Sequence, residues 1–347
     1  MLLVLRHCIP KYFTVELLNH FIELFYYGDC DSSKIPSISL DFASRDKLKM
    51  SGPETLMFVR MFGLLVSDRV PHDDPFWIFL NLKLSQLLDK CLSKSISPRM
   101  SVSLRILVEE FNEIYVCVPN DTLKPKFHFQ VHYSTIIDES GPVALTSTKR
   151  FESKHRSLLM RAHDTQSRMQ ICVTVAIHHQ LQMCFRCKSR SRIIPKPEFG
   201  PLHEVSWANF SNPECLKSVL ATPMSSCMSA NWVKLKGTKY KLRMVLTLQI
   251  DNSENPVFGH IEAIILESNN SFVLVFSHLM NLGFDSHVHG YEVESSDSWS
   301  KVYVMNLFDP LPHNINLSAS ESKKFVVLHC ELSAHNLNFK LISVSVI

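Results

Sequence analysis

Glu152 is the side chain in this sequence whose neighbours most clearly favour chemistry. It is the only acidic residue in the run 149–156. Its neighbours are Lys149, Arg150, Lys154, His155 and Arg156. A carboxylate ringed by cations stays ionised and is well placed beside a phosphate or a metal ion. Glu152 is therefore the first candidate for a catalytic residue.

Two histidines, His128 and His132, stand four residues apart in a segment with helical character. At this spacing both rings lie on one face of a helix, as two metal ligands would. A metal site needs a third ligand, and no His-Glu-x-x-His motif supplies one. The alternative is a pair of packed, hydrogen-bonded histidines, which the neighbouring Phe127, Phe129 and Val131 favour.

Cysteine and histidine pairs further along the chain are weaker metal candidates. Cys184 and Cys187 have the spacing of half a zinc site, but no second Cys-x-x-Cys motif completes it, so reduced structural thiols are the alternative. His287 and His289, near Asp285, would point to the same side of a strand. For this pair a polar strand edge is the alternative to a metal site.

A basic belt between Lys149 and Arg192 is the candidate for nucleic-acid binding. This stretch has ten Lys or Arg and two acidic residues, whereas the rest of the chain has 26 and 31. Such a concentration of charge is typical of a surface that binds phosphates, although a solvated helical face gives the same pattern. The candidate contacts to DNA or RNA are Lys154, Arg156, Arg161, Arg168, Arg186, Lys188, Arg190 and Arg192.

Three runs of this sequence resemble transposases of the CACTA-like group from animal genomes. The runs are VPHDDPFW at 70–77, KPKFHFQVHY to RFESKHR at 124–156, and the segment 258–293. The resemblance covers most of residues 12–330. It implies descent from an RNase H-like enzyme that binds two divalent metals with three carboxylates, with Glu152 as the last of them.

The same resemblance implies that the catalytic set is incomplete. The first two aspartates of the family belong to a segment N-terminal to the runs matched here. Asp29, Asp31 and Asp41 lie in expected loops and do not fit that role. We therefore expect a transposase-derived, non-catalytic chain that binds nucleic acid or a protein partner and carries no cofactor. The alternatives are an enzyme fragment or subunit, which would bind divalent metal once another segment completes it, and a relic without selected function.

Composition points to a folded intracellular protein. The chain has 347 residues, of which 46% are hydrophobic and 20% charged, as in globular proteins of two domains. No stretch approaches the ~20 apolar residues of a membrane span. Arg6 and His7 interrupt the only apolar N-terminal run, so no signal peptide is recognisable. These features predict reduced cysteines and a location in the nucleus or cytoplasm, neither secreted nor in a membrane.

Periodicity predicts an α+β fold with helices first and strands last. Helical patterns cover 12–27, 51 onward, 74–92, 97–117, 125–141, 153–162 and 167–187. Five prolines then punctuate 191–230, which we interpret as a linker or strap. Strand patterns follow at 240–250, 257–267, 271–279, 291–308 and 324–332. The expected organisation is a helical region at 1–190, a β-rich module at 231–335, forming a bent sheet or barrel, and a tail at 336–347.

Overall fold

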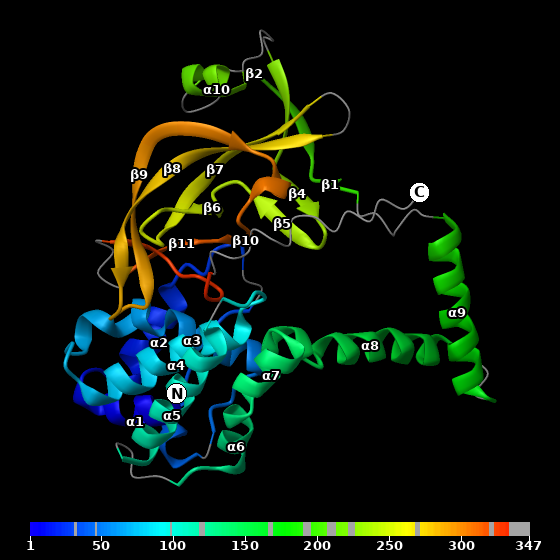
Figure 1. The fold of residues 1–347 in the computed structure, drawn as a ribbon. Helices are drawn as coiled ribbons and strands as arrows, with labels where there is room; N and C mark the ends of the chain where they lie inside the picture. The colour runs from blue at the N-terminus through cyan, green and yellow to red at the C-terminus, as the bar shows by residue number, and fades with distance from the viewer. Residues whose placement is uncertain are drawn as a thin grey trace.

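The computed structural model describes most of the chain. The described residues are 1–30, 33–45, 47–97, 99–117, 122–165, 169–189, 196–206, 213–220, 226–267, 271–318 and 323–332. A helical N-terminal part is followed by an antiparallel sheet that curls into half a barrel (Figure 1). The predicted α+β class and its order of elements are confirmed. The predicted tail at 336–347 lies outside the described residues.

The N-terminal part is built from short and medium helices. They are α1 (Leu2–Lys11), α2 (Val15–Leu24), η1 (Leu40–Ser44), α3 (Gly52–Val66), η2 (Ser67–Arg69), the π-helical η3 (Trp77–Leu82), α4 (Lys83–Leu92), α5 (Met100–Cys117), α6 (Pro125–Val131), α7 (Tyr133–Ser140), η4 (Val143–Thr146), α8 (Lys149–Asp164) and α9 (Ile171–Ser189). The periodic segments of the sequence correspond to α2 to α9. Helix α1 was not predicted, because Arg6, His7 and Pro10 interrupt its apolar pattern.

Local signals begin the central helices where the sequence predicts. Ser51 and Glu54 form a capping box at the start of α3, in which the Ser51 N–H donates to Glu54 Oε2 at 2.6 Å. Asp74 Oδ1 accepts the Trp77 N–H at 3.0 Å, which caps the helical run through η3 and α4. Helix α3 then buries residues on nearly all sides, because other elements surround it.

The C-terminal sheet has long, bent strands. Its main path runs β10 (Asp309–His313), β6 (Val245–Ile250), β7 (Pro256–Leu266), β8 (Phe272–Asp285), β9 (Gly290–Val302), β12 (Lys324–Val326) and β11 (Ile315–Leu317), all antiparallel. The pairings of β7 with β8 and of β8 with β9 both contain register shifts. Such irregularities bend strands, and they account for the curl of the sheet.

The segment 191–230 contributes structure to this sheet. Strand β2 (Leu202–Ser206) pairs with β3 (Ser226–Ala230), and β3 pairs with β7. Strand β1 (Glu198–Phe199) joins a small second sheet with β4 (Trp232–Leu235) and β5 (Thr238–Lys241). Helix α10 (Pro213–Leu220) places Leu216 against Val273 and Val275. The sequence of 191–230 shows no helical or strand periodicity, because its elements are short and prolines separate them.

Both faces of the central strands are covered, which explains their unbroken apolar runs. On β8, Leu274 and Phe276 belong to the core beneath the small sheet, whereas Val273 and Val275 face α10. A strand buried on both faces loses the alternation of apolar and polar residues that a half-exposed strand shows. The sequence FVLVF at 272–276 is therefore the expected one for this position.

The sheet docks on the helices through the turn between β8 and β9. The Trp77 Nε1–H donates to the His287 carbonyl at 3.1 Å, and His287 Nε2 lies 3.1 Å from the carbonyl oxygens of Ser67 and Val70. Val288 belongs to the same hydrophobic core as Trp77. His287 is thus buried in a turn, where it bonds to the helical part. The strand-edge position that we predicted as the alternative to a metal site does not describe it.

Gly63 in α3 offers a direct test of this docking. A Cβ at Gly63 would overlap the carbonyl oxygen of Val288, whereas one at Gly52 in the same helix would meet nothing within 4 Å. We expect Gly63→Ala to lower the free energy of unfolding by about 1–3 kcal/mol through overpacking. Gly52→Ala should be neutral or stabilising by up to about 1 kcal/mol. Denaturant unfolding of both variants measures the difference, and equal stabilisation by the two would contradict the docking.

Candidate functional site

Helices α8 and α9 form an arm that stands away from the rest of the molecule. In Figure 1, α8 leaves the helical body near α7 and α9 crosses its far end. Among the side chains that the structure describes in these two helices, none is buried. The inner side of the angle between them is lined by residues such as Leu158, Val175 and His179. The arm lies within the basic belt of the sequence, and its described cations are Arg156, Arg161, Arg186 and Lys188.

The described cations of the arm are accessible to a ligand. Arg156 and Arg161 on α8 and Lys188 on α9 are exposed, and Arg186 is half-buried. Of the remaining candidates, Arg168, Arg190 and Arg192 lie outside the described residues, and so does the side chain of Lys154. Charge at exposed, separated positions favours contact with phosphates over contact with base edges.

Glu152 lies in the first turn of α8, exposed to solvent. Thr148 Oγ1 donates to Glu152 Oε1 at 3.3 Å, and the Glu152 N–H donates to the Thr148 carbonyl at 3.0 Å. A carboxylate in this position stabilises the helix through its dipole, which is a sufficient structural role. In the described part of the chain, no group of three or more His, Cys, Asp or Glu side chains is placed to hold a metal ion.

His128 and His132 do face one another. Their ring centroids are 4.8 Å apart, and their Nε2 atoms are separated by 3.2 Å, so one ring can donate to the other. The pair lies at the junction of α6 and α7, because the single helix predicted for 125–141 breaks at His132. The surroundings are more open than Phe129 and Val131 suggested, since both of those side chains are exposed.

Cys184 and Cys187 are both exposed on α9 as free thiols. They stand three residues apart, about one helical turn. Within the described residues they belong to no cluster of metal-ligating side chains. Thiols placed in this way are accessible to reagents, and the helix supplies no further ligand nearby.

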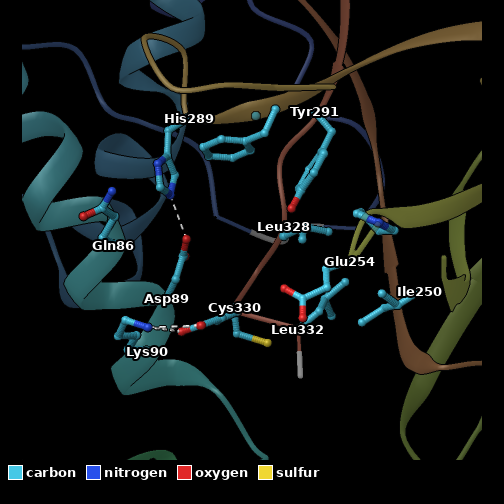
Figure 2. Close-up of a pocket in the computed structure, with 14 residues that line it drawn as sticks. Gln86, Asp89, Lys90, Ile250, Glu254, His289, Tyr291, Leu328, Cys330 and Leu332 are labelled. Atoms are coloured by element: carbon cyan, nitrogen blue, oxygen red, sulfur yellow. Dashed lines mark hydrogen bonds and ion pairs between the residues drawn. The ribbon is translucent and has the colours of Figure 1, made fainter. Parts of the chain in front are cut away.

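A cavity of about 450 Å³ opens at the seam between the helices and the sheet. Figure 2 shows the His289 ring pointing to Asp89. His289 Nε2 donates to Asp89 Oδ2 at 2.7 Å, and Lys90 Nζ lies 2.7 Å from Glu331 Oε2. Tyr291 forms part of the wall. These two ion pairs cross the seam and join α4 to the turn before β9 and to the 328–332 segment.

The chemistry of the seam cavity is limited. Burial raises the pKa of the Cys330 thiol to about 12, and the carboxylates of Asp309 and Asp89 add to this effect. Burial also raises the pKa of Tyr291, together with the charges of Asp89 and Glu331. A thiol and a phenol held neutral in this way are poor nucleophiles at neutral pH. The cavity therefore offers no activated nucleophile among its described side chains.

A buried polar cluster beside the seam was not identified from the sequence. The rings of His313 and His329 stack with centroids 5.0 Å apart, and Arg60 donates to His329 Nδ1 at 3.0 Å and to its carbonyl oxygen. Asp309 Oδ2 lies 4.0 Å from His313 Nε2. The sequence pattern does not reveal this cluster, because His313 and His329 each stand alone among apolar residues and Arg60 is far from both in the sequence.

Comparison of the chain with models of known protein families, with curated proteins and with solved structures finds no match. Among the helices in the described ranges, none combines the length and the apolar character needed to cross a membrane. Of the features described above, the exposed basic arm is the strongest candidate for a binding site.

Proposed function

We propose that this chain is a transposase-derived, non-catalytic protein that binds nucleic acid through the α8–α9 arm. The observation that carries the proposal is the exposure of Arg156, Arg161 and Lys188 on a projection that buries none of its described side chains. Phosphates of DNA or RNA would contact these cations and release bound counterions. Binding of this kind is independent of sequence and sensitive to salt.

The transposase ancestry rests on the runs that resemble the CACTA-like group. Two of these runs pack against each other, since Trp77 of the VPHDDPFW run contacts His287 of the 258–293 run. Such packing is consistent with one inherited structural unit. The non-catalytic character rests on Glu152, which is exposed and accepts a hydrogen bond from the Thr148 hydroxyl at the start of its own helix. We place the protein in the nucleus or cytoplasm, where its free cysteines would stay reduced.

Neutralising the described cations of the arm tests the binding proposal. We expect Arg156→Gln, Arg161→Gln, Arg186→Gln and Lys188→Gln, combined in one variant, to weaken binding to all DNA and RNA sequences alike. Wild-type dissociation constants should be ~10⁻⁴–10⁻⁶ M at physiological salt, and the variant should lose about tenfold or more at low salt. The slope of affinity against salt should also become shallower. Fluorescence anisotropy with labelled oligonucleotides measures both quantities.

A matched control neutralises four exposed lysines outside the arm: Lys47, Lys49, Lys236 and Lys301. This control has the same change in net charge and should retain most of the affinity. Equal losses in both variants would show that net charge, and not the arm, is responsible.

Metal-dependent strand cleavage that Glu152→Gln abolishes would favour the enzyme alternative. If the wild-type protein does not bind DNA or RNA at low salt, two alternatives remain: a chain that binds a protein partner, or a relic without selected function.

A further inference from the structure

The outer face of α9 is apolar and uncovered. Val173, Ile177, Leu181 and Phe185 follow one another at intervals of four residues and are 51%, 55%, 63% and 66% exposed. At this spacing they form one stripe along the helix, which ends at Lys188. The opposite side of α9, including Val175 and His179, faces α8. The stripe therefore points away from the contacts that the arm makes within its own chain.

Nucleic acid is not a suitable partner for this apolar stripe, which needs an apolar protein surface to cover it. Helix α9 spans 19 residues, and a helix of this kind draws most of its stability from packing an apolar face. Phosphates would neutralise the cations of the arm but would leave Leu181 and Phe185 in water. A protein surface that is apolar and carries acidic side chains would cover the stripe and pair with Lys188.

The outer face of α5 has these properties. Val102, Ile106 and Val116 are 46%, 49% and 42% exposed, and Glu109 and Glu113 are exposed between them. The five side chains fall on one face of the helix at spacings of three and four residues. The inner face of α5 packs in the core. The outer face is thus a second uncovered stripe. Glu109 and Glu113 on it carry charge opposite to that of the arm, and the exposed Arg105 stands beside them.

We propose that α9 of one copy docks on α5 of a second copy, so that two chains exchange their arms reciprocally. Within one copy the two faces cannot meet, because α8 holds α9 at its far end, away from α5 (Figure 1). A two-fold arrangement makes the same junction twice, as symmetric dimers do. In each junction the apolar residues of the two stripes are covered, and Glu109 and Glu113 face the basic end of α9.

Single aspartates placed in each stripe test the dimer. Wild-type protein should sediment as a dimer at micromolar concentration. Leu181→Asp on α9 and Ile106→Asp on α5 should each raise the dimer dissociation constant at least tenfold. Leu282→Asp is the control, since Leu282 is 58% exposed on β8, outside both stripes. All three sites are exposed, so circular dichroism should show folded protein in every case.

Mixing the two variants identifies the reciprocal exchange. Leu181→Asp protein retains a good α5 face, and Ile106→Asp protein retains a good α9 face. One junction of the exchanged dimer can therefore form between them, and the mixture should associate more strongly than either variant alone. A monomeric wild type, a dimer insensitive to both variants, or a mixture no stronger than its components would each overturn the proposal. The aspartate variants keep Arg156, Arg161, Arg186 and Lys188. Sedimentation of these variants therefore tests the dimer without changing the cations that the nucleic-acid proposal needs.

Discussion

Replacing Asp74 by alanine is expected to lower the free energy of unfolding by about 3–5 kcal/mol, the cost of breaking a buried network of ion pairs and hydrogen bonds. The Asp74 side chain is 1% exposed. Its Oδ2 accepts from Tyr12 at 2.6 Å, His7 at 2.8 Å and Lys11 at 3.3 Å, and its Oδ1 accepts the Trp77 N–H. The variant would lose the helix cap and leave these donors without their acceptor.

The neighbouring Asp73→Ala is the matched control, because Asp73 is exposed. It should change stability by less than about 0.5 kcal/mol, as surface substitutions usually do. Denaturant unfolding of the two variants gives the comparison. Similar small effects in both would show that Asp74 does not tie α1 to the start of η3.

The pH dependence of the Asp74 effect has a definite sign. Burial by itself would raise the pKa of Asp74, but the hydrogen bonds from Tyr12, His7, Trp77 and Lys11 outweigh it and hold that pKa well below its usual range. A carboxyl with a depressed pKa in the folded state stabilises the protein above the pKa of the unfolded chain. The difference between wild type and Asp74→Ala should therefore be full at neutral pH and shrink as pH falls below about 4.

The second large effect is a loss of stability in mild acid, of which the lowered pKa of His329 alone accounts for about 3 kcal/mol between pH 7 and pH 4. Burial lowers the pKa of His329 to about 4, and the positive charge of Arg60 adds to this. Burial also holds the pKa of His313 well below its usual range, helped by His329 and Arg60. The unfolded chain takes up protons on these rings below about pH 6.5, but the folded chain resists them, so stability falls with pH.

Asp309 acts in the opposite direction. Burial raises its pKa, although the N–H of Leu311 donates to it and partly offsets the effect. A carboxyl with a raised pKa in the folded state contributes more stability as pH falls. The net loss should therefore be smaller in the part of this range in which Asp309 takes up its proton.

Equilibrium unfolding at several pH values tests the histidine cluster. His329→Gln should flatten the dependence of stability on pH between 6.5 and 4, whatever its effect at pH 7. The exposed His203 provides a control, and His203→Gln should leave the slope unchanged. A slope that is the same in all three proteins would show that the buried pair does not govern acid sensitivity.

The sequence by itself determined the class and order of the elements. The capping box at Ser51 and Glu54, the cap at Asp74 and the apolar periods that follow act over a few residues, and the structure contains the corresponding helices. The long apolar runs of β7 and β8 likewise identify buried strands. Local signals of this kind survive in the fold because they depend on neighbours in the chain and on the spacing of side chains.

Only the tertiary structure decided which side chains meet. His289 pairs with Asp89, and Asn314 Nδ2 donates to the carbonyl of Tyr27, across 200 and 287 residues of sequence respectively. The sequence also could not show that α8 and α9 stand apart from the core, because their composition is compatible with packing. Which residues are buried, and which cations remain exposed, depends on contacts between segments that are remote in the chain. No local pattern encodes those contacts, since each segment carries only half of the interaction.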